Sequence, residues 1–326
     1  MLNSEPGKLF VHSVLERAAA NPRTIVFPET GDARTVQAVR KLQQERTVTS
    51  VLVGEGEDVS GIERIIPATD TRLPRIAELL HARRCAKGLT SEQARGLALD
   101  PLYFADGLVA LGEVDGCVAG AVHSTGDVVR AALWTVGTAP GVRTVSSSFY
   151  MLVNNFRNRG AEVLTFTDCA VVPDPTARQL ADIAIAAAAD RRRIVGDEPC
   201  VALMSYSSVG SAEGPSVDKV REARAILAID APTLNVDGEL QGDAALIESV
   251  AQRKAPDSTV AGRANVLVFP SLDAGNLAYK LVQRLSNCMA IGPILQGMRR
   301  PCSDLSRGAE PAEIALVAAI TALQAG

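Results

Sequence analysis

Residues 162–205, EVLTFTDCAVVPDPTARQLADIAIAAAADRRRIVGDEPCVALMS, decide the fold class. Glu162–Asp168 and Cys200–Ser205 are short apolar runs of strand length, and Thr176–Arg193 between them is an alanine-rich segment of helix length. A strand, a helix and a second strand in this order are typical of α/β proteins with buried, parallel strands.

The same alternation extends in both directions along the chain. Apolar runs predict further strands at Thr24–Glu29, Ser50–Glu55, Gly116–Val122, Thr144–Met151 and Asn265–Pro270. Longer segments predict helices at Ala33–Glu45, Arg72–Ala86, Thr90–Leu97, Gly126–Val136, Ser216–Ile229, Gly242–Gln252, Asn276–Arg284 and Pro311–Gln324. Because ligands of such folds bind beyond the carboxyl ends of strands, the loops that follow strands are the places to search for a site.

Length and composition indicate an ordinary globular protein. The chain has 326 residues, of which 47% are hydrophobic and 21% charged, so about two domains are expected. A net charge of −4 argues against a general nucleic-acid binder, and 4% aromatic residues argue against stacking on single strands.

The cysteines, the histidines and the hydropathy of the chain bear on its redox state, on metal binding and on its cellular location. The six cysteines include no C-x-x-C pair and the three histidines are dispersed, so we expect reduced thiols and no metal site. The N-terminus has no basic region followed by an apolar run, and no uninterrupted apolar stretch reaches about 18 residues. We therefore expect a protein of the cytoplasm, or of a bacterial microcompartment lumen, without a membrane span.

Several common catalytic motifs are missing from the sequence. It contains no G-x-x-x-x-G-K-[ST] loop, no complete G-x-G-x-x-G, no G-x-S-x-G and no H-E-x-x-H. Standard kinases, dehydrogenases, α/β-hydrolases and zinc proteases are therefore disfavoured.

Four loops carry polar residues, three of them directly after predicted strands, and each also has a structural interpretation. Ser205–Ala212 (SYSSVGSA) could bring backbone N–H groups close to an anion, or could be a plain turn. In His123–Arg130 (HSTGDVVR), Ser124 or Thr125 can cap the next helix, where Arg130 is either a ligand-binding or a solvated side chain.

In the loop Thr167–Thr176, the polar and small residues have a structural explanation that needs no ligand. Asp174 can cap the following helix, with Pro175 at its first position. Cys169 in the same loop can be a small buried residue.

The fourth loop, Asp304–Gly308 (DLSRG), precedes the C-terminal helix. Ser306 and Arg307 offer a hydroxyl and a bidentate phosphate ligand near a helix N-terminus. Glu313 occupies the third helical position, which is favoured for a capping glutamate. Because Glu310 rather than Ser or Thr precedes Pro311, we expect that capping box to be incomplete.

Taken together, the loops match one family. The matching stretches are GAVHSTGDVVRAAL, SSSFYML, TDCAVVPDPTARQLADIAI, SYSSVGSA, VDGELQGDAA, APDSTVAGRANVLVFPSLDAGNLAYKLVQRL, IGPILQGMRRP and SDLSRG. In this order they resemble the phosphate acetyltransferase (phosphotransacetylase) family, within the phosphate acetyl/butyryltransferase group.

The resemblance implies a fold and a reaction. The expected fold is two three-layer α/β domains with mainly parallel sheets and an active-site cleft between them, residues 1–143 plus 291–326 forming one domain and 144–290 the other. The expected reaction is reversible acetyl transfer between acetyl phosphate and coenzyme A, with inorganic phosphate as the other partner. A homodimer is expected, with no tightly bound cofactor and no nucleic-acid or membrane partner.

The resemblance also implies roles for individual residues. Ser306 and Arg307 match the family's catalytic Ser-Arg pair, and Glu313 stands where the family can carry an aspartate proposed as general base. The substrate-binding residues implied are Arg84, Ser124, Thr125, Arg130, Cys169, Ser207, Ser208, Gly210 and Ser211. The separate roles of Arg83 and Arg84 stay open. The chain departs from the family pattern at Val209 (commonly lysine), Ser303 (asparagine) and Ala309 (cysteine).

The implied mechanism is direct transfer in a ternary complex. A carboxylate removes the thiol proton, the thiolate attacks the acetyl carbonyl, and phosphate leaves while arginines hold it. Two alternatives stay open: a phosphate butyryl- or propionyltransferase with the same fold, and a non-catalytic acetyl-CoA-sensing module. Rates on acyl phosphates of different length test the first, and binding without turnover would favour the second.

Overall fold

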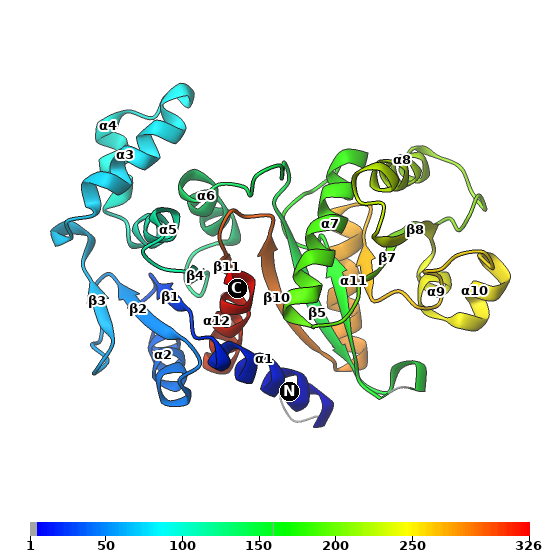
Figure 1. The fold of residues 1–326 in the computed structure, drawn as a ribbon, viewed down its shortest axis with the longest axis horizontal. Helices are drawn as coiled ribbons and strands as arrows, with labels where there is room; N and C mark the ends of the chain where they lie inside the picture. The colour runs from blue at the N-terminus through cyan, green and yellow to red at the C-terminus, as the bar shows by residue number, and fades with distance from the viewer. Residues whose placement is uncertain (1–4, 159) are drawn as a thin grey trace. The chain divides into compact units, whose positions relative to one another are not determined.

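The computed structural model describes residues 5–158 and 160–326, which form two compact units (Figure 1). Val11–Pro140 and Met298–Gly326 make up one, the five-stranded unit. Gly141–Gly297, with residues 5–10, make up the other, the six-stranded unit. The chain leaves the five-stranded unit after residue 140 and returns to it at residue 298, so the C-terminal segment completes that unit.

The sheet of the five-stranded unit is parallel, with strand order β11-β4-β1-β2-β3. Its strands are β1 (Thr24–Phe27), β2 (Thr49–Val53), β3 (Glu63–Ile65), β4 (Gly116–Ala119) and β11 (Cys302–Asp304). Every residue of β4 and β11 is buried, as expected for parallel strands covered on both faces.

Helices cover both faces of this sheet. They are α1 (Glu5–Ala20, which begins in the other unit), α2 (Ala33–Glu45), α3 (Leu73–Arg84), α4 (Ser91–Ala98), α5 (Pro101–Leu111), α6 (Thr125–Thr135) and α12 (Pro311–Ala325), with short 3₁₀ turns at Pro67–Thr69 and Cys85–Lys87. Successive strand residues point to opposite faces, so Val26 packs in the core formed with α3 to α6, whereas Ile25 lies on the α12 side. α12 packs against β1, β4 and α2.

The order of the strands reverses between β1 and β4. From β1 the chain steps outward to β2 and β3, and it then returns to place β4 on the other side of β1. In open α/β sheets the carboxyl ends of strands at such a reversal are where ligands bind. The loops after β1, β4 and β11 are therefore the first place to look for a site in this unit.

The six-stranded unit contains a mixed sheet in the order β10-β5-β6-β9-β7-β8. Its strands are β5 (Ser146–Val153), β6 (Glu162–Thr167), β7 (Cys200–Met204), β8 (Asn235–Leu240), β9 (Val266–Val268) and β10 (Met289–Gln296). β5 runs antiparallel to both β6 and β10, whereas the other pairs are parallel. β10 continues to Gln296, past residue 291, where the resemblance places a domain boundary.

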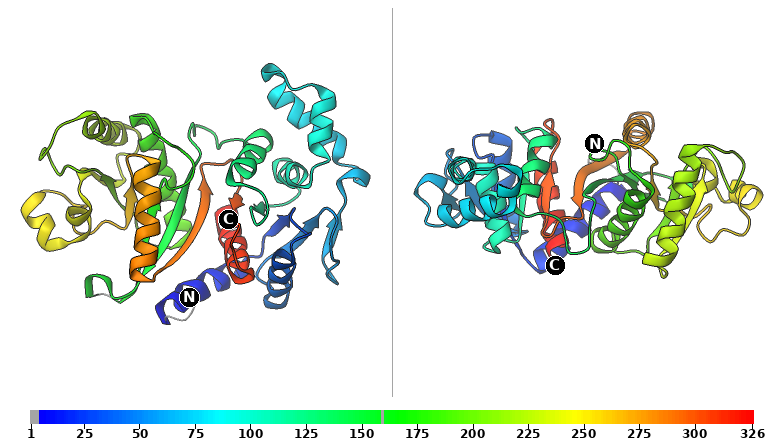
Figure 2. Two further views of the ribbon diagram at one scale, coloured as in Figure 1. Left: turned by 180° about the vertical axis from the view of Figure 1, so that it is seen from behind. Right: turned by 90° about the horizontal axis from the view of Figure 1, so that it is seen from above.

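Two helical layers enclose this second sheet. The helices are α7 (Ala177–Ile194), α8 (Pro215–Asp230), α9 (Gly242–Leu246), α10 (Glu248–Lys254) and α11 (Leu272–Ser286), with a 3₁₀ turn at Phe156–Asn158. α7 and α8 share one apolar core with the sheet, and α9 and α11 share another on the opposite face. Figure 2 shows α7 and α11 on the two sides of the sheet.

The predicted fold class is confirmed, because both units are α/β with flanking helices. The helix predicted at Ala33–Glu45 is found with those bounds, whereas the one predicted at Gly242–Gln252 is interrupted at Ile247. The elements that the sequence analysis did not predict are α1, α5, β3, β8, β10 and β11. No helix in the described part of the chain is long and apolar enough to cross a lipid bilayer.

The prediction that Asp174 caps α7 is wrong. The N-cap is Thr176, whose hydroxyl accepts from the backbone N–H of Gln179 while the Gln179 side chain accepts from that of Thr176. This reciprocal capping box satisfies both N–H groups, which a lone aspartate two residues earlier cannot do. Asp174 instead forms an ion pair with Lys219, 2.7 Å away.

Candidate functional site

Glu29 lies in the loop after β1, two residues beyond the end of the strand. Its contacts connect this loop to the loop after β4. Its buried carboxylate accepts hydrogen bonds from the backbone N–H groups of Ala121, Val122 and His123, at 2.7, 3.0 and 2.9 Å. The partners lie more than 90 residues away in sequence, in the loop after β4. One carboxylate therefore fixes the backbone that leads from β4 into α6.

His123 makes a further contact with the same carboxylate. Its Nδ1 lies 2.8 Å from Glu29 Oε1. Because a carboxylate can only accept, Nδ1 carries the hydrogen, and in the neutral ring Nε2 then holds a free lone pair. The His123 side chain is 34% exposed and that of Glu29 only 2%, so the imidazole bridges a buried anion and the surface.

Ser124 and Thr125 begin α6, as the sequence predicts for one or the other. Ser124 is the N-cap; its hydroxyl accepts from the backbone N–H of Asp127 and donates to the Asp127 carboxylate at 2.6 Å. The Thr125 hydroxyl donates to Oδ2 of Asp304, also at 2.6 Å. Both hydroxyls thus hold the α6 N-terminus in place.

Asp304 links α6 to the loop that carries Ser306 and Arg307. It is fully buried at the end of β11, and burial raises its pKa to about 7 although the Thr125 hydrogen bond opposes that shift. Gly120, with φ +107°, is required here because a Cβ would lie 2.5 Å from Leu305 N. The backbone of Leu305, the residue before Ser306, is therefore closely packed against Gly120.

Arg34 fixes the same loop from the other side. Its guanidinium donates to the carbonyl oxygens of Arg307, Ala309 and Ala121, at 2.8, 3.1 and 3.0 Å. It also forms an ion pair with Asp32, the N-cap of α2. The sequence analysis did not single out Arg34; the loop PETGDAR after the first strand was the available signal. Arg34 and Glu29 together join the loops after β1, β4 and β11.

Ser306 and Arg307 are exposed on this fixed loop. Ser306 Oγ accepts from the Gly308 N–H at 3.3 Å. Among the residues that the structure describes, the Arg307 guanidinium has no hydrogen-bond or ion-pair partner. An unpaired guanidinium at the carboxyl end of a parallel sheet can take a phosphate.

Glu313 lies on the first turn of α12, which begins seven residues after Asp304. The Glu313 carboxylate accepts from the backbone N–H of Glu310 at 3.0 Å, and the Glu310 side chain caps the helix in return. The expectation of an incomplete capping box is therefore wrong, since Glu310 takes the place of a serine or threonine. Glu313 is exposed, and one of its oxygens is engaged in the cap.

Arg84 and Arg130 lie beside an aromatic pair in the same unit. The Arg84 guanidinium lies over the Trp134 ring, 4.4 Å from its centroid, and Trp134 is tilted against Tyr103 at 6.1 Å. Arg130, one turn before Trp134 on α6, pairs with Asp127 at 2.8 Å and is half exposed. The buried Nε of Arg84 has no hydrogen-bond partner among the described residues. The Trp134 ring therefore contacts a guanidinium whose Nε–H is not hydrogen-bonded to a carboxylate.

Arg83 is placed differently from Arg84. Its Nη1 packs against Gly137, and burial, followed by the charge of Arg299, lowers its pKa. The two neighbouring arginines thus reach different parts of the five-stranded unit.

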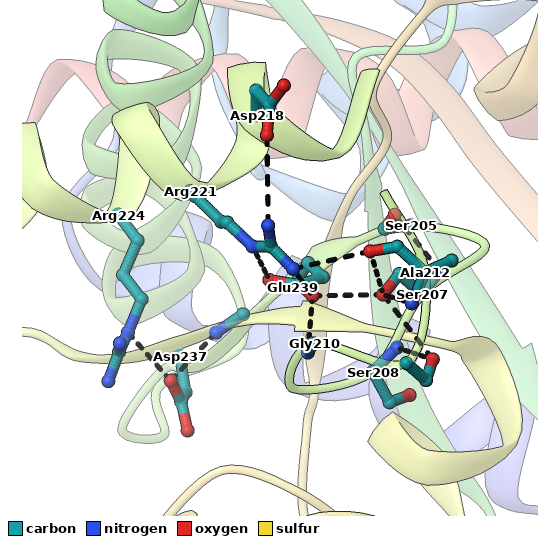
Figure 3. A network of polar contacts seen from close by, with 12 residues as sticks. Ser205, Ser207, Ser208, Gly210, Ala212, Asp218, Arg221, Arg224, Asp237 and Glu239 are labelled. Carbon is teal, nitrogen blue, oxygen red and sulfur yellow. Dashed lines mark hydrogen bonds and ion pairs between the residues drawn. The ribbon is translucent and has the colours of Figure 1, made fainter. Parts of the chain in front are cut away.

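The Ser205–Ala212 loop lies in the six-stranded unit and is organised around Glu239 (Figure 3). Glu239 Oε1 accepts from Ser207 Oγ and from the Gly210 N–H, both at 2.9 Å. Ser211 Oγ accepts from the Ser208 N–H at 2.9 Å. Two of the groups expected to bind an anion, the Ser207 hydroxyl and the Gly210 N–H, therefore donate to a carboxylate of the chain itself.

Arg221 completes this network. It donates from Nε and Nη2 to the Glu239 carboxylate at 2.9 Å. Burial raises the pKa of Glu239, but Arg221 and the loop donors outweigh that effect and lower it to about 2. The Ser205–Ala212 loop is therefore held by the buried Glu239 carboxylate, which pairs with the partly exposed Arg221 guanidinium.

Cys169 lies in the core of the six-stranded unit. It is fully buried in the cluster that α11 covers, and burial raises the pKa of its thiol. The structure thus supports packing for Cys169. In the described ranges no group of three His, Cys, Asp or Glu side chains could hold a metal ion.

Comparison with known proteins identifies the family. A family model described as phosphate acetyl/butaryl transferase matches residues 9–322. A phosphate acetyltransferase from Paracoccus denitrificans is 46% identical over 312 residues, which cover 95% of this chain and 97% of that protein. One from Thermoanaerobacterium thermosaccharolyticum is 45% identical over 324 residues, covering 97% and 99%.

A solved structure agrees with these relatives. The phosphotransacetylase from Streptococcus pyogenes superposes with a TM-score of 0.91 at 40% identity, covering 98% of each chain. The fold, the loops described above and these matches agree, and the chain belongs to the phosphate acetyl/butyryl transferase family.

Proposed function

We propose that this protein is a phosphate acetyltransferase, which interconverts acetyl-CoA plus phosphate and coenzyme A plus acetyl phosphate. The observation that carries the proposal is the exposed Ser306–Arg307 pair, held at the strand reversal by Arg34 and Asp304. Family membership supplies the reaction class.

The phosphoryl group is bound by arginine. The Arg307 guanidinium is unpaired within the described part of the chain and can hold two phosphate oxygens at once. Arg84 and Arg130 supply further positive charge beside the aromatic pair. The phosphates of coenzyme A and of acetyl phosphate both need such partners, so we assign these arginines to the two substrates together.

Ser306 donates to the oxyanion that forms on the acetyl carbonyl or to the departing phosphate. Loss of one such donor typically costs about 3–4 kcal/mol of transition-state stabilisation. Phosphate is a good leaving group, so direct attack by the thiolate needs no acyl-enzyme. Holding two substrates in line can supply about 7–11 kcal/mol of the barrier reduction.

Thiol deprotonation is the demanding step. The resemblance assigns it to Glu313, but a free glutamate and a free thiol differ by about four pKa units, or roughly 6 kcal/mol. The Glu313 carboxylate also accepts the Glu310 N–H at the start of α12. We keep Glu313 as one candidate base, and a second is considered below.

The remaining partners follow from the same proposal. Coenzyme A is a substrate, and no tightly bound cofactor is proposed. We propose a homodimer, supported by an exposed apolar stripe on α11: Leu277, Leu281 and Leu285 are 61%, 57% and 83% exposed. We propose the cytoplasm as its location. For the six-stranded-unit residues Ser207, Ser208, Gly210, Ser211 and Cys169, which the resemblance implies as substrate-binding, we propose structural roles instead, and their contacts within the unit support this.

The experiment is a thioester assay at 233 nm with coenzyme A and acetyl phosphate, omitting each substrate in turn. The expected result is thioester formation that needs both substrates and falls at least 100-fold in Arg307→Ala. Arg40→Ala, which removes another exposed arginine of the same unit, is the matched control. Binding of acetyl-CoA without turnover would contradict the proposal and favour a sensing module, whereas faster turnover of butyryl or propionyl phosphate would change the substrate.

A further inference from the structure

The proposed reaction needs a base near the thiol, and the five-stranded unit contains a candidate that the resemblance does not name. This inference rests on the proposed function and concerns which residue takes the proton. The candidate is His123, in the loop between β4 and α6, at the strand reversal.

Its geometry is that of an oriented imidazole. Glu29 Oε1 lies 2.8 Å from His123 Nδ1 and 2.9 Å from the backbone N–H of the same residue. Ring and backbone are thus held by one carboxylate. Because Nδ1 donates to Glu29, the second nitrogen, Nε2, is left to accept a proton, and no hydrogen bond to it is found among the described residues.

The loop that carries His123 is linked to the loop that carries the candidate phosphate site. Arg34 donates both to the carbonyl of Ala121, two residues before His123, and to that of Arg307. Asp304 joins Thr125, two residues after His123, to the loop that carries Ser306. The segments on either side of His123 are therefore linked to the Ser306–Arg307 loop, one through the Arg34 guanidinium and the other through the hydrogen bond between the Thr125 and Asp304 side chains.

The chemistry favours an imidazole over a carboxylate. For free side chains, a thiol at about 8.5 lies about two pKa units above an imidazole and about four above a carboxylate. Proton transfer is thus unfavourable by about 10²-fold to the imidazole, against about 10⁴-fold to the carboxylate. Glu313 in addition has an oxygen engaged with the α12 N-terminus.

We propose that His123 is the general base for coenzyme A and that Glu29 is its positioning residue. The thiol S–H bond breaks as an N–H bond forms at Nε2. The thiolate sulfur bonds to the acetyl carbon, and the carbon–oxygen bond to the phosphoryl group breaks. The imidazolium returns its proton to the departing phosphate, so the products are acetyl-CoA and hydrogen phosphate and the enzyme is unchanged.

The decisive variant is His123→Asn. An asparagine amide nitrogen can occupy the position of Nδ1 and keep the hydrogen bond to Glu29, but it supplies nothing in place of Nε2. We expect an unchanged melting temperature, a kcat about 10²–10⁴-fold lower, and a KM for coenzyme A within about threefold of wild type. At the other candidate base, Glu313→Gln is expected to lower kcat less than His123→Asn does, and His12→Asn, in an exposed pair with Glu16, is the control.

A second measurement does not depend on turnover. Long-range proton–nitrogen NMR of the wild type, with His123→Asn for assignment, should show the Nδ1–H tautomer of His123. The Nε2–H tautomer would overturn the inference. Wild-type kcat in His123→Asn would also overturn it, and a 100-fold loss in Glu313→Gln beside that result would make Glu313 the base. Absence of any acetyl transfer by the wild type would overturn the proposed function and this inference with it, and the wild-type rate distinguishes that case.

Discussion

Glu239 is the residue whose replacement has the most directly calculable effect. Its carboxylate is 4% exposed and accepts from Arg221, Ser207 and Gly210. These contacts hold its pKa at about 2, against an ordinary 4.5. A difference of about 2.5 units corresponds to about 3 kcal/mol of stability supplied by the charged form.

Glu239→Gln approximates the protonated carboxyl without changing its size. Because the folded-state pKa is depressed, the contribution is complete above the unfolded value and is lost as the pH falls through the folded one. We therefore expect the variant to be less stable than wild type by about 3 kcal/mol at pH 7 and by about 1.4 kcal/mol at pH 3. Urea unfolding followed by far-UV circular dichroism at both pH values measures this difference.

Glu198→Gln is the matched control. Glu198 belongs to the same unit and pairs with Arg192, but its side chain is 83% exposed, so its removal should change stability by less than about 1 kcal/mol. An equal loss for both variants, or a Glu239→Gln loss that does not shrink in acid, would refute the reasoning. In that case the Ser205–Ala212 loop would not be organised by the Glu239 charge.

Three further predictions concern the five-stranded unit. Arg307→Ala should leave the circular dichroism spectrum unchanged while lowering kcat/KM for acetyl phosphate at least 100-fold in the thioester assay; a near-wild-type value would remove Arg307 from the site. Trp134→Leu removes the ring beneath Arg84 and should raise the KM for coenzyme A about threefold to tenfold with kcat within about twofold; since the chain has 1 tryptophan, its emission in the wild type should also change on titration with coenzyme A. Burial raises the pKa of Asp106 from 3.8 to about 7, so wild-type stability should fall as the pH rises through that interval. Asp106→Asn should abolish about 3 kcal/mol of the fall between pH 5 and pH 8, measured by thermal unfolding at both pH values; identical pH dependence in both proteins would contradict it.

Elements with a strong local signal could be predicted from the sequence. α2 has a capping aspartate and a regular apolar face, and its bounds match the prediction. β8, NVDGEL, has a glycine and two acidic residues, and only its last two residues are buried, so its pattern does not indicate a strand. It is a strand because β7 pairs with it in parallel, which no local pattern reveals.

The candidate site likewise contains features that short motifs predict and contacts that they do not. The Ser124 cap and the exposed Ser306–Arg307 pair follow from short motifs. The contact between Glu29 and His123 joins residues 94 apart, and that between Arg34 and Arg307 joins residues 273 apart. The sequence also left the Ser205–Ala212 loop as either an anion site or a turn, because the carboxylate that fills it stands on β8.

The most direct test of the central claim is a crystal structure with coenzyme A and phosphate bound. The claim predicts phosphate on the Arg307 guanidinium and the coenzyme A sulfur within about 3.5 Å of His123 Nε2 or a Glu313 oxygen. Phosphate bound elsewhere, with Ser306, Arg307 and His123 all left facing solvent, would contradict it.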